Sequence, residues 1–437
     1  MKMKFVKTGI NGEGIGYADR MPVFCEGVLA GETAEVEITE RKKTYAKAQL
    51  IRIIERSENR RKPFCRYYEE CGACSLMHVR NMTQAQIKTQ LLEEALYKYG
   101  NVKRHFVRKF HESPLTSGYR NQCKLPVAEK DGKLVTGMYK PGSNHFTEIP
   151  SCLIHDPQLE EARKAVLDVL NKYHMRAYDK KAQYGIRYLI LRHLNNQTQC
   201  TLITGKDRID QACINDLMKI RYMTSVFQSV NTELKGTAFF GSRCTLLAGK
   251  ETIEVKTGDI TLNLSPESFF QLNFPQAEKL YETAVSKVDP CGLLVEAYCG
   301  IGAMSLMAAK KAQRVIGIEY VKDAVENAKR NAEANGITNA EFFAADAADG
   351  LYRAARMDKV DILLADPPRS GMDDNMLEAI LRVQPEKIIY VSCNPATLAK
   401  NIKVLKEKYL VETVMPFDLF PNTPHIESIT VLQKAKA

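Results

Sequence analysis

The pattern of apolar and polar positions divides the chain into three parts. Residues 1–57 start with closely spaced glycines and continue with alternating segments such as AEVEITE and AKAQLIRII, which is the pattern of a small β-barrel. From about 118 to 262 most segments also read as strands, with a hairpin turn at Asp131-Gly132 and a helix at LEEARKAVLDVLNKY. From about 263 onward strand and helix patterns alternate, which indicates a parallel sheet. We therefore predict an α/β protein with three domains, at residues 1–57, 58–262 and 263–437.

The third part contains five strand candidates, LLVEAY, RVIGIE, AEFFAAD, VDILLAD and KIIYVS, separated by helices such as KDAVENAKRNAEANG. Two more strands, LVETVMPFD and ESITVLQK, close the sheet like a hairpin. This order predicts a doubly wound domain, which binds its ligands at the carboxyl ends of the strands. A further helix is expected at residues 83–100, where Gly100 stops the helical spacing.

The excess of basic over acidic residues is compatible with a polyanionic partner. The 437 residues include 62 Lys and Arg against 52 Asp and Glu, so the net charge is +10, which suits a nucleic acid but also an ordinary solvated surface. The N-terminus lacks the apolar segment of a signal peptide, and no run of 18 apolar residues could cross a membrane. Twelve cysteines without an export signal indicate reduced thiols or metal ligands. We expect a cytoplasmic protein with no membrane partner.

A basic loop with an aromatic residue, RKKTY at residues 41–45, lies between two strands of the first domain. On a small barrel such a loop fits phosphate contacts and base stacking. A charged hairpin tip without a ligand explains the same residues.

Three cysteines stand within ten residues, and Gly72 eases the loop between them: Cys65, Cys71 and Cys74. Iron–sulfur clusters and structural zinc sites both take four such ligands, so this spacing predicts an inorganic centre. The fourth ligand is expected to be Cys152, in the loop IPSC. Cys123 is nearer in sequence but lies in an apparent strand. The CxxxCxxC spacing of radical enzymes is absent, which favours a structural or RNA-positioning centre.

Several strands of the third domain end in groups that suit a nucleoside cofactor. The first ends in EAYCGIG, where Gly300 and Gly302 allow a tight turn and a close approach to a ligand. Ser305 replaces the third glycine of the dinucleotide fingerprint, which disfavours a pyrophosphate cofactor. Glu319 ends the next strand, where a carboxylate can accept ribose hydroxyls, and Asp346 ends the third, near an adenine amino group. S-adenosylmethionine fits this arrangement.

The fourth and fifth strands end in residues that suit methylation of carbon. Asp366 is the first residue of the loop DPPR, whose two prolines make it rigid and whose last residue is Arg369. Cys393 follows the strand KIIYVS, and Glu427 is the first residue of the last strand, two residues after a histidine. C5 of uracil is a poor nucleophile, but a thiolate that adds at C6 converts the ring to an enolate that can attack a methyl group. A base must then remove the C5 proton. Cys393 suits the nucleophile and Glu427 the base, whereas Cys393 as a small core residue is the simpler alternative.

These motifs together resemble the RNA uracil-C5 methyltransferase family, which shows SFFQLN (268–273), YCGIG, DPPR, SCNP and HIE in this order. The resemblance implies a Rossmann-like methyltransferase domain, an N-terminal TRAM barrel and a mostly β central domain. It implies that Cys393 is the nucleophile and Glu427 the proton acceptor. It also implies that Gln271, Tyr298, Glu319 and Asp366 contact S-adenosylmethionine and that Asp346 lies near its adenine. It further implies that the ligands of a [4Fe-4S] cluster are Cys65, Cys71, Cys74 and Cys152.

Within the family, a TRAM domain with cluster cysteines resembles the 23S rRNA enzymes more than the shorter tRNA enzymes. The resemblance therefore implies methylation of specific 23S rRNA uridines that are flipped out or single-stranded. Glu296 departs from the more common Asp, and Ile426 from Val. For Phe269 and Phe270 we expect core positions. A tRNA substrate, an amino-group methyltransferase using DPPR, and a non-catalytic iron–sulfur RNA-binding protein are the alternatives.

Overall fold

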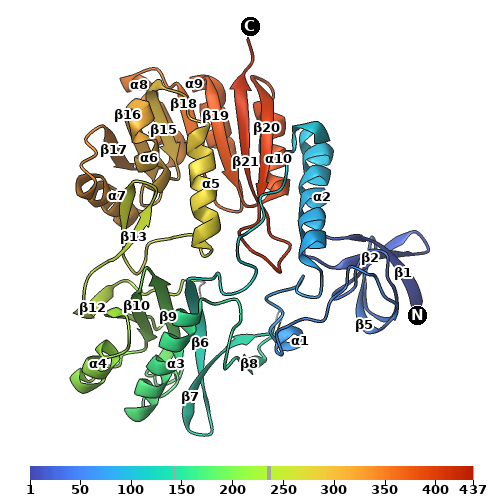
Figure 1. Ribbon diagram of the computed structural model, residues 1–437, viewed down its shortest axis with the longest axis vertical. Coiled ribbons are helices and arrows are strands. Elements are labelled where there is room, and N and C mark those ends of the chain that lie inside the picture. The colour runs from blue at the N-terminus through green and yellow to red at the C-terminus, as the bar shows by residue number, and fades with distance from the viewer. Residues whose placement is uncertain (141–142, 234–237, 437) are drawn as a thin grey trace. The chain divides into compact units, whose positions relative to one another are not determined.

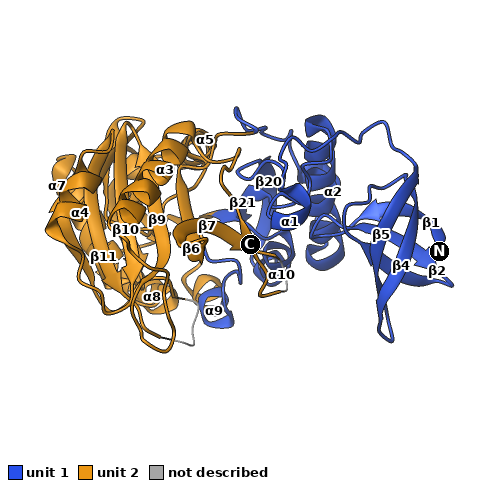
Figure 2. Cartoon of the chain, turned by 90° about the horizontal axis from the view of Figure 1, so that it is seen from below, with its two compact units in different colours: residues 1–116, 367–377, 390–437 blue, residues 117–366, 378–389 orange. Residues whose placement is uncertain are grey.

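The computed structural model describes residues 1–140, 143–233 and 238–436. The described chain forms two compact units (Figure 2). Unit 1 comprises residues 1–116, 367–377 and 390–437, and unit 2 comprises residues 117–366 and 378–389. Each unit therefore combines segments that are distant in the sequence. The three domain limits expected from the sequence stay a prediction.

The N-terminal part of unit 1 is the expected barrel (Figure 1). Its five strands close in the order β1-β2-β3-β5-β4, with bounds β1 (Lys2–Thr8), β2 (Gly14–Ala18), β3 (Met21–Cys25), β4 (Thr33–Arg41) and β5 (Ala46–Glu55). Alternate residues point inward, as the period of two requires. These strand positions form a core with Val28 from the loop after β3; its strand residues are Met3, Phe5, Val23, Cys25, Ala34, Val36 and Ala46.

The basic loop of the barrel joins β4 to β5 as a hairpin tip. Lys42 and Lys47 both pair with Glu40, at 2.7 and 3.0 Å between Nζ and the carboxylate oxygens. Tyr45 packs edge-on against Phe24, with 5.8 Å between the ring centres. These contacts within the barrel explain the conformation of several loop residues without a bound ligand. The role of the loop in RNA binding stays a prediction.

The remainder of unit 1 contains one long helix and the last two strands. Helix α2 (Asn81–Gly100) confirms the helix expected at 83–100 and packs against α10 (Pro395–Leu405) (Figure 1). A Cβ at Gly100 would lie 2.9 Å from the carbonyl oxygen of Ala399, so glycine permits this close approach. The other elements are α1 (Tyr68–Cys71), the 3₁₀ turn η1 (Arg104–Phe106), and the antiparallel pair β20 (Tyr409–Phe417) and β21 (Glu427–Lys434).

A buried ion pair ties α2 to the loop between β20 and β21. Lys88 has no solvent exposure, and its ammonium group lies 2.6 Å from a carboxylate oxygen of Asp418 and 3.0 Å from the carbonyl oxygen of Phe420. Asp418 itself is only 8% exposed. Burial lowers the pKa of Lys88, and the carboxylate of Asp418 opposes that shift.

Replacing Lys88 by Met should destabilise the protein strongly, because it leaves the Asp418 carboxylate buried without a cation. Breaking a buried pair in this way typically costs about 3–5 kcal/mol. Urea unfolding of Lys88→Met measures this loss. Lys98→Met on the same helix is the control, since Lys98 is exposed and should change the free energy of unfolding by less than about 0.5 kcal/mol. Equal stabilities of the two variants would contradict the prediction.

The first part of unit 2 is a seven-stranded sheet in the order β12-β11-β10-β9-β6-β7-β8. Its strands are β6 (Gln122–Lys130), β7 (Lys133–Tyr139), β8 (Phe146–Glu148), β9 (Ile186–Leu194), β10 (Gln197–Thr204), β11 (Met223–Val230) and β12 (Cys244–Gly249). Asp131 and Gly132 both have positive φ, 51° and 72°, which confirms the hairpin turn expected between β6 and β7. Residues of α3 (Pro157–Lys172) and α4 (Gln211–Met218) share an apolar core with one face of this sheet.

The second part of unit 2 is the parallel sheet, in the strand order β17-β16-β15-β18, with the start of β19 next to β18. The strands are β15 (Cys291–Ala297), β16 (Ala312–Glu319), β17 (Ala340–Ala344), β18 (Ile362–Ala365) and β19 (Lys387–Ser392). The division between the units falls within β19.

Helices and a small hairpin accompany these strands. The helices are α5 (Phe274–Ser286), α6 (Ala303–Ala308) with the 3₁₀ turn η2 (Ala309–Lys311), α7 (Lys322–Ala334), α8 (Ala347–Met357) and α9 (Asp374–Val383). Strands β13 (Ile253–Thr257) and β14 (Ile260–Leu264) form a separate two-stranded sheet. The architecture expected from the sequence, an α/β domain with an N-terminal barrel and a mostly β central part, is confirmed.

Candidate active site

The turn after β15 is shaped by three residues with left-handed backbone. Tyr298, Gly300 and Gly302 have φ of 63°, 54° and 83°. A Cβ at Gly302 would lie 2.9 Å from the ring of Phe342, whereas a Cβ at Gly300 would meet nothing within 4 Å. Gly302 is therefore required by packing, and Gly300 borders open space. At Tyr298 a non-glycine residue with positive φ stores strain of roughly 1–3 kcal/mol, which is common at functional sites.

Glu319, at the end of β16, makes one hydrogen bond to this turn and one to the residue before α7. One carboxylate oxygen accepts from the amide of Gly300 at 3.0 Å, and the other accepts from the amide of Val321 at 2.9 Å. Each oxygen of a carboxylate can accept a second hydrogen bond. Glu319 can thus bind ribose hydroxyls while it holds the turn.

Asp346 has a structural role that the sequence analysis missed. It is the N-cap of α8, and one of its carboxylate oxygens accepts from the amide of Ala348 at 2.9 Å. An Asp directly before a helix is a known signal for this role. Asp346 is exposed, so its second oxygen can still meet an adenine amino group.

Two acidic side chains at the ends of β15 and β18 have raised pKa values. Burial raises the pKa of Glu296 to about 8, and the negative charges of Asp366 and Glu319 add to this shift. Glu296 is 1% exposed and accepts a short hydrogen bond from the hydroxyl of Ser305. Burial also raises the pKa of Asp366 to about 7. A sulfonium cation near these strand ends would favour the ionised form of Asp366.

Glu296→Gln should remove a pH dependence of stability. The folded-state pKa of Glu296 is raised above the unfolded value near 4.5, so the folded protein binds more protons than the unfolded chain between about pH 4.5 and 8. Wild-type stability should therefore fall as pH rises through this range, by up to about 1.4 kcal/mol per pH unit. Urea unfolding at several pH values should show this slope reduced in Glu296→Gln and retained in a control, Glu326→Gln on the exposed face of α7. Parallel pH profiles for Glu296→Gln and wild type would refute the assignment.

The segment that carries Gln271 is anchored by buried polar groups of the central sheet. The guanidinium of Arg192, which is 3% exposed, donates to the carbonyl oxygens of Ser265 and Ser268. The side-chain amide of Asn121 donates to the carbonyl oxygen of Gln271 at 2.9 Å. The Gln271 side chain is 7% exposed. These long-range anchors had no signal in the sequence.

The expectation of core positions for two phenylalanines is confirmed for one and wrong for the other. Phe270 is 3% exposed and packs against Phe274, with 5.6 Å between ring centres. Phe269 is 72% exposed. Residues 268–271 form neither a helix nor a strand, and the two neighbouring rings face different environments.

Within unit 1, Cys393 and Glu427 come from adjacent strand ends. Cys393 directly follows β19, and Glu427 is the first residue of β21, the strand next to β19. The hydroxyl of Ser428 lies 3.5 Å from the carbonyl oxygen of Ser392, so the residues next to Cys393 and Glu427 are in contact. Cys393 is half-buried, and Glu427 is 4% exposed. The two side chains expected to perform the chemistry thus start from neighbouring positions.

The residues around Cys393 form a hydrogen-bonded turn. Asn394 caps α10 by accepting from the amide of Ala396 at 3.0 Å, and its side-chain amide donates to the carbonyl oxygen of Arg369 at 3.0 Å. The guanidinium of Arg369 lies 3.1 Å from Nδ1 of His425. Burial, followed by the charges of Arg369 and Lys88, lowers the pKa of His425, so this imidazole is neutral at pH 7.

The expected cluster ligands are divided between the units. The first three, Cys65, Cys71 and Cys74, surround α1 in unit 1 and are half-buried, and Gly72 ends α1 with φ of 65°. Cys152 lies in unit 2, in the loop between β8 and α3. In the described part of the chain, no three His, Cys, Asp or Glu side chains are gathered as a metal site. The inorganic centre expected from the cysteine spacing stays a prediction.

The two candidates for the fourth ligand differ in acidity. Burial disfavours the thiolate of Cys152, but the hydrogen bond from His155 and the charge of that residue lower the thiol pKa overall. Burial raises the pKa of Cys123, which is 1% exposed in β6, to about 12. Metal ligation requires the thiolate, so Cys152 is the better suited of the two.

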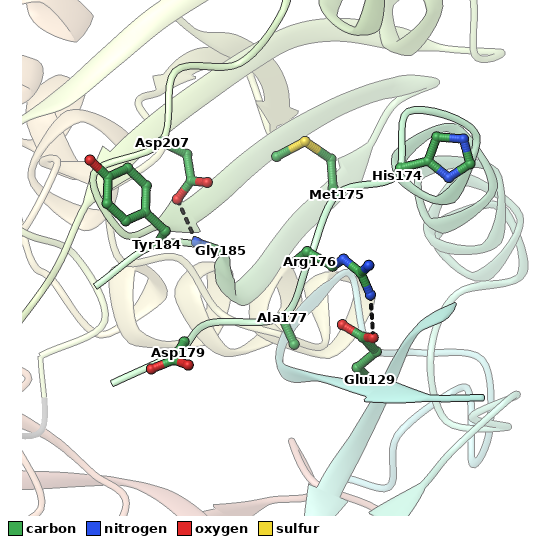
Figure 3. A pocket seen from close by; sticks show the side chains of 9 residues that line it. All are labelled: Glu129, His174, Met175, Arg176, Ala177, Asp179, Tyr184, Gly185 and Asp207. Atoms are coloured by element: carbon green, nitrogen blue, oxygen red, sulfur yellow. Dashed lines mark hydrogen bonds and ion pairs between the residues drawn. The ribbon is translucent and has the colours of Figure 1, made fainter. Parts of the chain in front are cut away.

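A pocket of about 440 Å³ lies in the central part of unit 2, lined by Glu129, His174–Ala177, Asp179, Tyr184, Gly185 and Asp207 (Figure 3). Its polar groups bind one another, since Arg176 pairs with Glu129 at 2.6 Å and Asp207 accepts from the amide of Gly185 at 2.5 Å. None of the expected site residues lines it.

Among the described helices, none combines the length and the apolar character needed to cross a bilayer.

Comparison with known proteins gives one consistent result. The family model for tRNA (uracil-5-)-methyltransferase matches residues 80–435, and that for the TRAM domain matches residues 4–51. A Bacillus cereus protein described as an RNA methyltransferase is 36% identical, with 98% of this chain and 95% of that protein covered. A Caldanaerobacter subterraneus relative of the same description is 35% identical, with 99% and 98% covered.

Among solved structures, the tRNA (uracil-54, C5)-methyltransferase of Pyrococcus abyssi in complex with S-adenosyl-L-homocysteine is similar over its full length. The TM-score is 0.78 at 25% identity, with 99% of this chain and 100% of that chain covered.

Proposed function

Because the chain belongs to the tRNA (uracil-5-)-methyltransferase family, whose reaction uses S-adenosylmethionine and an RNA substrate, we propose that it methylates C5 of specific uridines in 23S rRNA. The assignment of Cys393 as nucleophile and Glu427 as base is supported by one observation. The strand ends next to these residues are neighbours, with Ser392 and Ser428 in contact. A thiol and a carboxylate at one place are what methylation at a pyrimidine carbon requires and what RNA binding alone does not.

The proposed reaction starts with the thiolate of Cys393 adding to C6 of the flipped or single-stranded uracil. The resulting C5 enolate attacks the methyl group of S-adenosylmethionine, and S-adenosylhomocysteine leaves. The Glu427 carboxylate then takes the proton from C5. The C6–sulfur bond breaks, which returns the thiolate and releases 5-methyluridine.

The cofactor contacts are proposed for the residues around the turn after β15, all in unit 2. Glu319 would accept from the ribose hydroxyls and Asp346 from the adenine amino group. Gln271 and Asp366 would lie near the methionine part. Tyr298, Gly300 and Gly302 would form the wall that the cofactor approaches. The open space beside Gly300 and the free-standing second oxygen of Asp346 at the helix cap support this assignment.

The choice of 23S rRNA rests on the combination of a TRAM domain with the cysteine set Cys65, Cys71, Cys74 and Cys152. A tRNA substrate is the second candidate, because the Pyrococcus abyssi structure of the same fold is named as a tRNA uracil-54 enzyme. Mass mapping of 5-methyluridine in 23S rRNA and tRNA from a deletion strain decides between them. Loss of the modification from tRNA alone would overturn the 23S assignment.

We also propose that the four cysteines bind a [4Fe-4S] cluster. When bound, such a cluster would be held by thiolates, and the lowered pKa of Cys152 favours that form. Protein purified without oxygen should show the visible absorbance of an iron–sulfur cluster and about four iron atoms per chain. Stoichiometric zinc without iron would instead support the structural zinc site.

A further inference from the structure

The loop between β20 and β21 leads directly into Glu427 and contains neither a helix nor a strand in residues 418–426. It is nevertheless buried and held from several sides within unit 1. Lys88 binds Asp418 and the carbonyl oxygen of Phe420, and the amide of Asp418 donates to the carbonyl oxygen of His111 at 3.0 Å. A loop that positions a proton acceptor needs such anchors, because an error of about 1 Å can cost on the order of 100-fold in rate.

Asn422 is the central anchor of this loop. Its side-chain oxygen accepts from Arg61 at 2.8 Å and from Gln84 at 3.3 Å, and its side-chain amide donates to the carbonyl oxygen of Thr116 at 2.7 Å. Its backbone amide donates to Gln84 at 2.8 Å, and its carbonyl oxygen accepts from the amide of Leu76 at 2.9 Å. Every polar group of the residue is therefore bound.

The backbone of Asn422 explains why an asparagine stands there. The residue is fully buried and has φ of 68°, in the left-handed region that Asn tolerates better than most other residues. Buried donors and acceptors that lose their partners are costly, so the five contacts hold this backbone in one conformation. Asn422 fixes the loop where the chain turns toward β21.

The residues that follow Asn422 are held by hydrogen bonds within the loop. The hydroxyl of Thr423 donates to the carbonyl oxygen of Phe420 at 2.8 Å and accepts from the amide of His425 at 3.3 Å. His425 in turn contacts Arg369. In the other direction, Leu76 lies two residues after Cys74, and Gln84 lies in α2.

We propose that Asn422 is a positioning residue for the proton-removal step: it fixes the loop that presents Glu427 and ties it to α2 and to the segment that carries Cys74. The inference rests on the proposed function, since it concerns the step assigned to Glu427. Asn422 touches neither reacting atom and acts through the loop.

The test uses the full-length protein, substrate RNA with ordinary uridine, and S-adenosylmethionine. If Glu427 is misplaced, methyl transfer still occurs but proton removal slows, so the covalent protein–RNA adduct accumulates on denaturing gels. We expect Asn422→Ala to increase the steady-state adduct about tenfold or more, with turnover reduced by 10- to 100-fold. RNA and cofactor dissociation constants should change less than about threefold. Asn422→Asp keeps the acceptor oxygen for Arg61 but loses the donor to Thr116, so it should recover more turnover than Asn422→Ala but not all of it.

The control is Asn171→Ala. The Asn171 side chain, in α3 of unit 2, likewise binds the backbone of another element: it accepts from the amide of Leu134 in β7 and donates to the carbonyl oxygen of that residue. It should lose stability without accumulating adduct. If Asn422→Ala does not fold, Gln84→Met is measured by the same criterion, because it removes two contacts of Asn422 and leaves that residue in place.

Suppose that Glu427→Gln accumulates adduct. If folded Asn422→Ala, or Gln84→Met in its place, then turns over slowly without accumulating adduct, the inference about Asn422 is overturned. If Glu427→Gln also fails to accumulate adduct, the proposed mechanism is wrong, and the role of Asn422 falls with it.

Discussion

Cys393→Ala should abolish methyl transfer and, with it, covalent capture of RNA that contains 5-fluorouridine. Without the thiolate, C6 of the uracil is not attacked, and C5 remains too weak a nucleophile to take the methyl group. Loss of a covalent nucleophile typically lowers the rate by 10⁴-fold or more. Fluorine at C5 cannot leave as a proton does, so wild-type protein should remain attached to the RNA after methyl transfer, as a stable band on a denaturing gel.

Cys291→Ala provides the matched control for this experiment. Cys291 is also half-buried, at the start of β15, but burial and the charges of Asp361 and Asp289 raise its pKa to about 11. It should therefore carry almost no thiolate at pH 7, and its removal should leave transfer and capture unchanged. An amino-group methyltransferase would lose no activity in Cys393→Ala. Retained capture by that variant would contradict the proposed nucleophile.

The strands next to Cys393 and Glu427 were predictable because each is a short apolar run bounded by a strong turn signal. KIIYVS and ESITVLQK match β19 and β21 residue for residue. Both are bounded by residues that cannot continue a strand, Asn394-Pro395 after the first and a loop with two prolines before the second. Their adjacency did not follow from the order of the strands in the sequence, because β21 lies between β19 and β20. Cys393 and Glu427 were paired by the chemistry that they suit and by the family resemblance.

Other features depend on contacts between residues far apart in the chain. Lys88 and Asp418 are separated by 330 positions, and Gln84 and Asn422 by 338. The helical spacing of residues 83–100 predicted α2, but nothing in it indicated that a lysine and a glutamine on this helix would be buried. Helix α4 has only eight residues, too few for a period of 3.6 to stand out in a β-rich region. An Asp at the end of a strand and directly before a helix can cap the helix or bind a ligand with the same carboxylate. The sequence does not separate these roles, so Asp346 was assigned only to the cofactor.

The cysteine set marks another limit of sequence reasoning. The spacing of Cys65, Cys71 and Cys74 indicates a ligand loop, but spacing is the same for iron and zinc. The choice between Cys123 and Cys152 gains a physical reason only from their surroundings, since Cys123 is buried in a strand whereas Cys152 lies beside His155.

Glu427→Gln should separate methyl transfer from product release. Glutamine has nearly the same shape as glutamate but cannot take a proton, so Cys393 can still add and C5 can still be methylated. The C5 proton then stays in place, and the C6–sulfur bond cannot break by elimination. Loss of a general base typically slows its step by 10²- to 10⁴-fold. We expect turnover to fall by that factor and a covalent complex to accumulate on ordinary uridine RNA, carrying label from the methyl group of S-adenosylmethionine.

Two observations distinguish this outcome from a general loss of activity. The complex should form in a single turnover at close to the wild-type rate, because the steps before proton removal do not use Glu427. Glu412→Gln, on the exposed side of the neighbouring strand β20, should turn over normally and show no complex. If Glu427→Gln binds RNA and cofactor but forms no adduct, Glu427 acts before C5 is methylated. The proton must then leave by way of another group, of which the neutral imidazole of His425, two residues away, is the nearest in sequence.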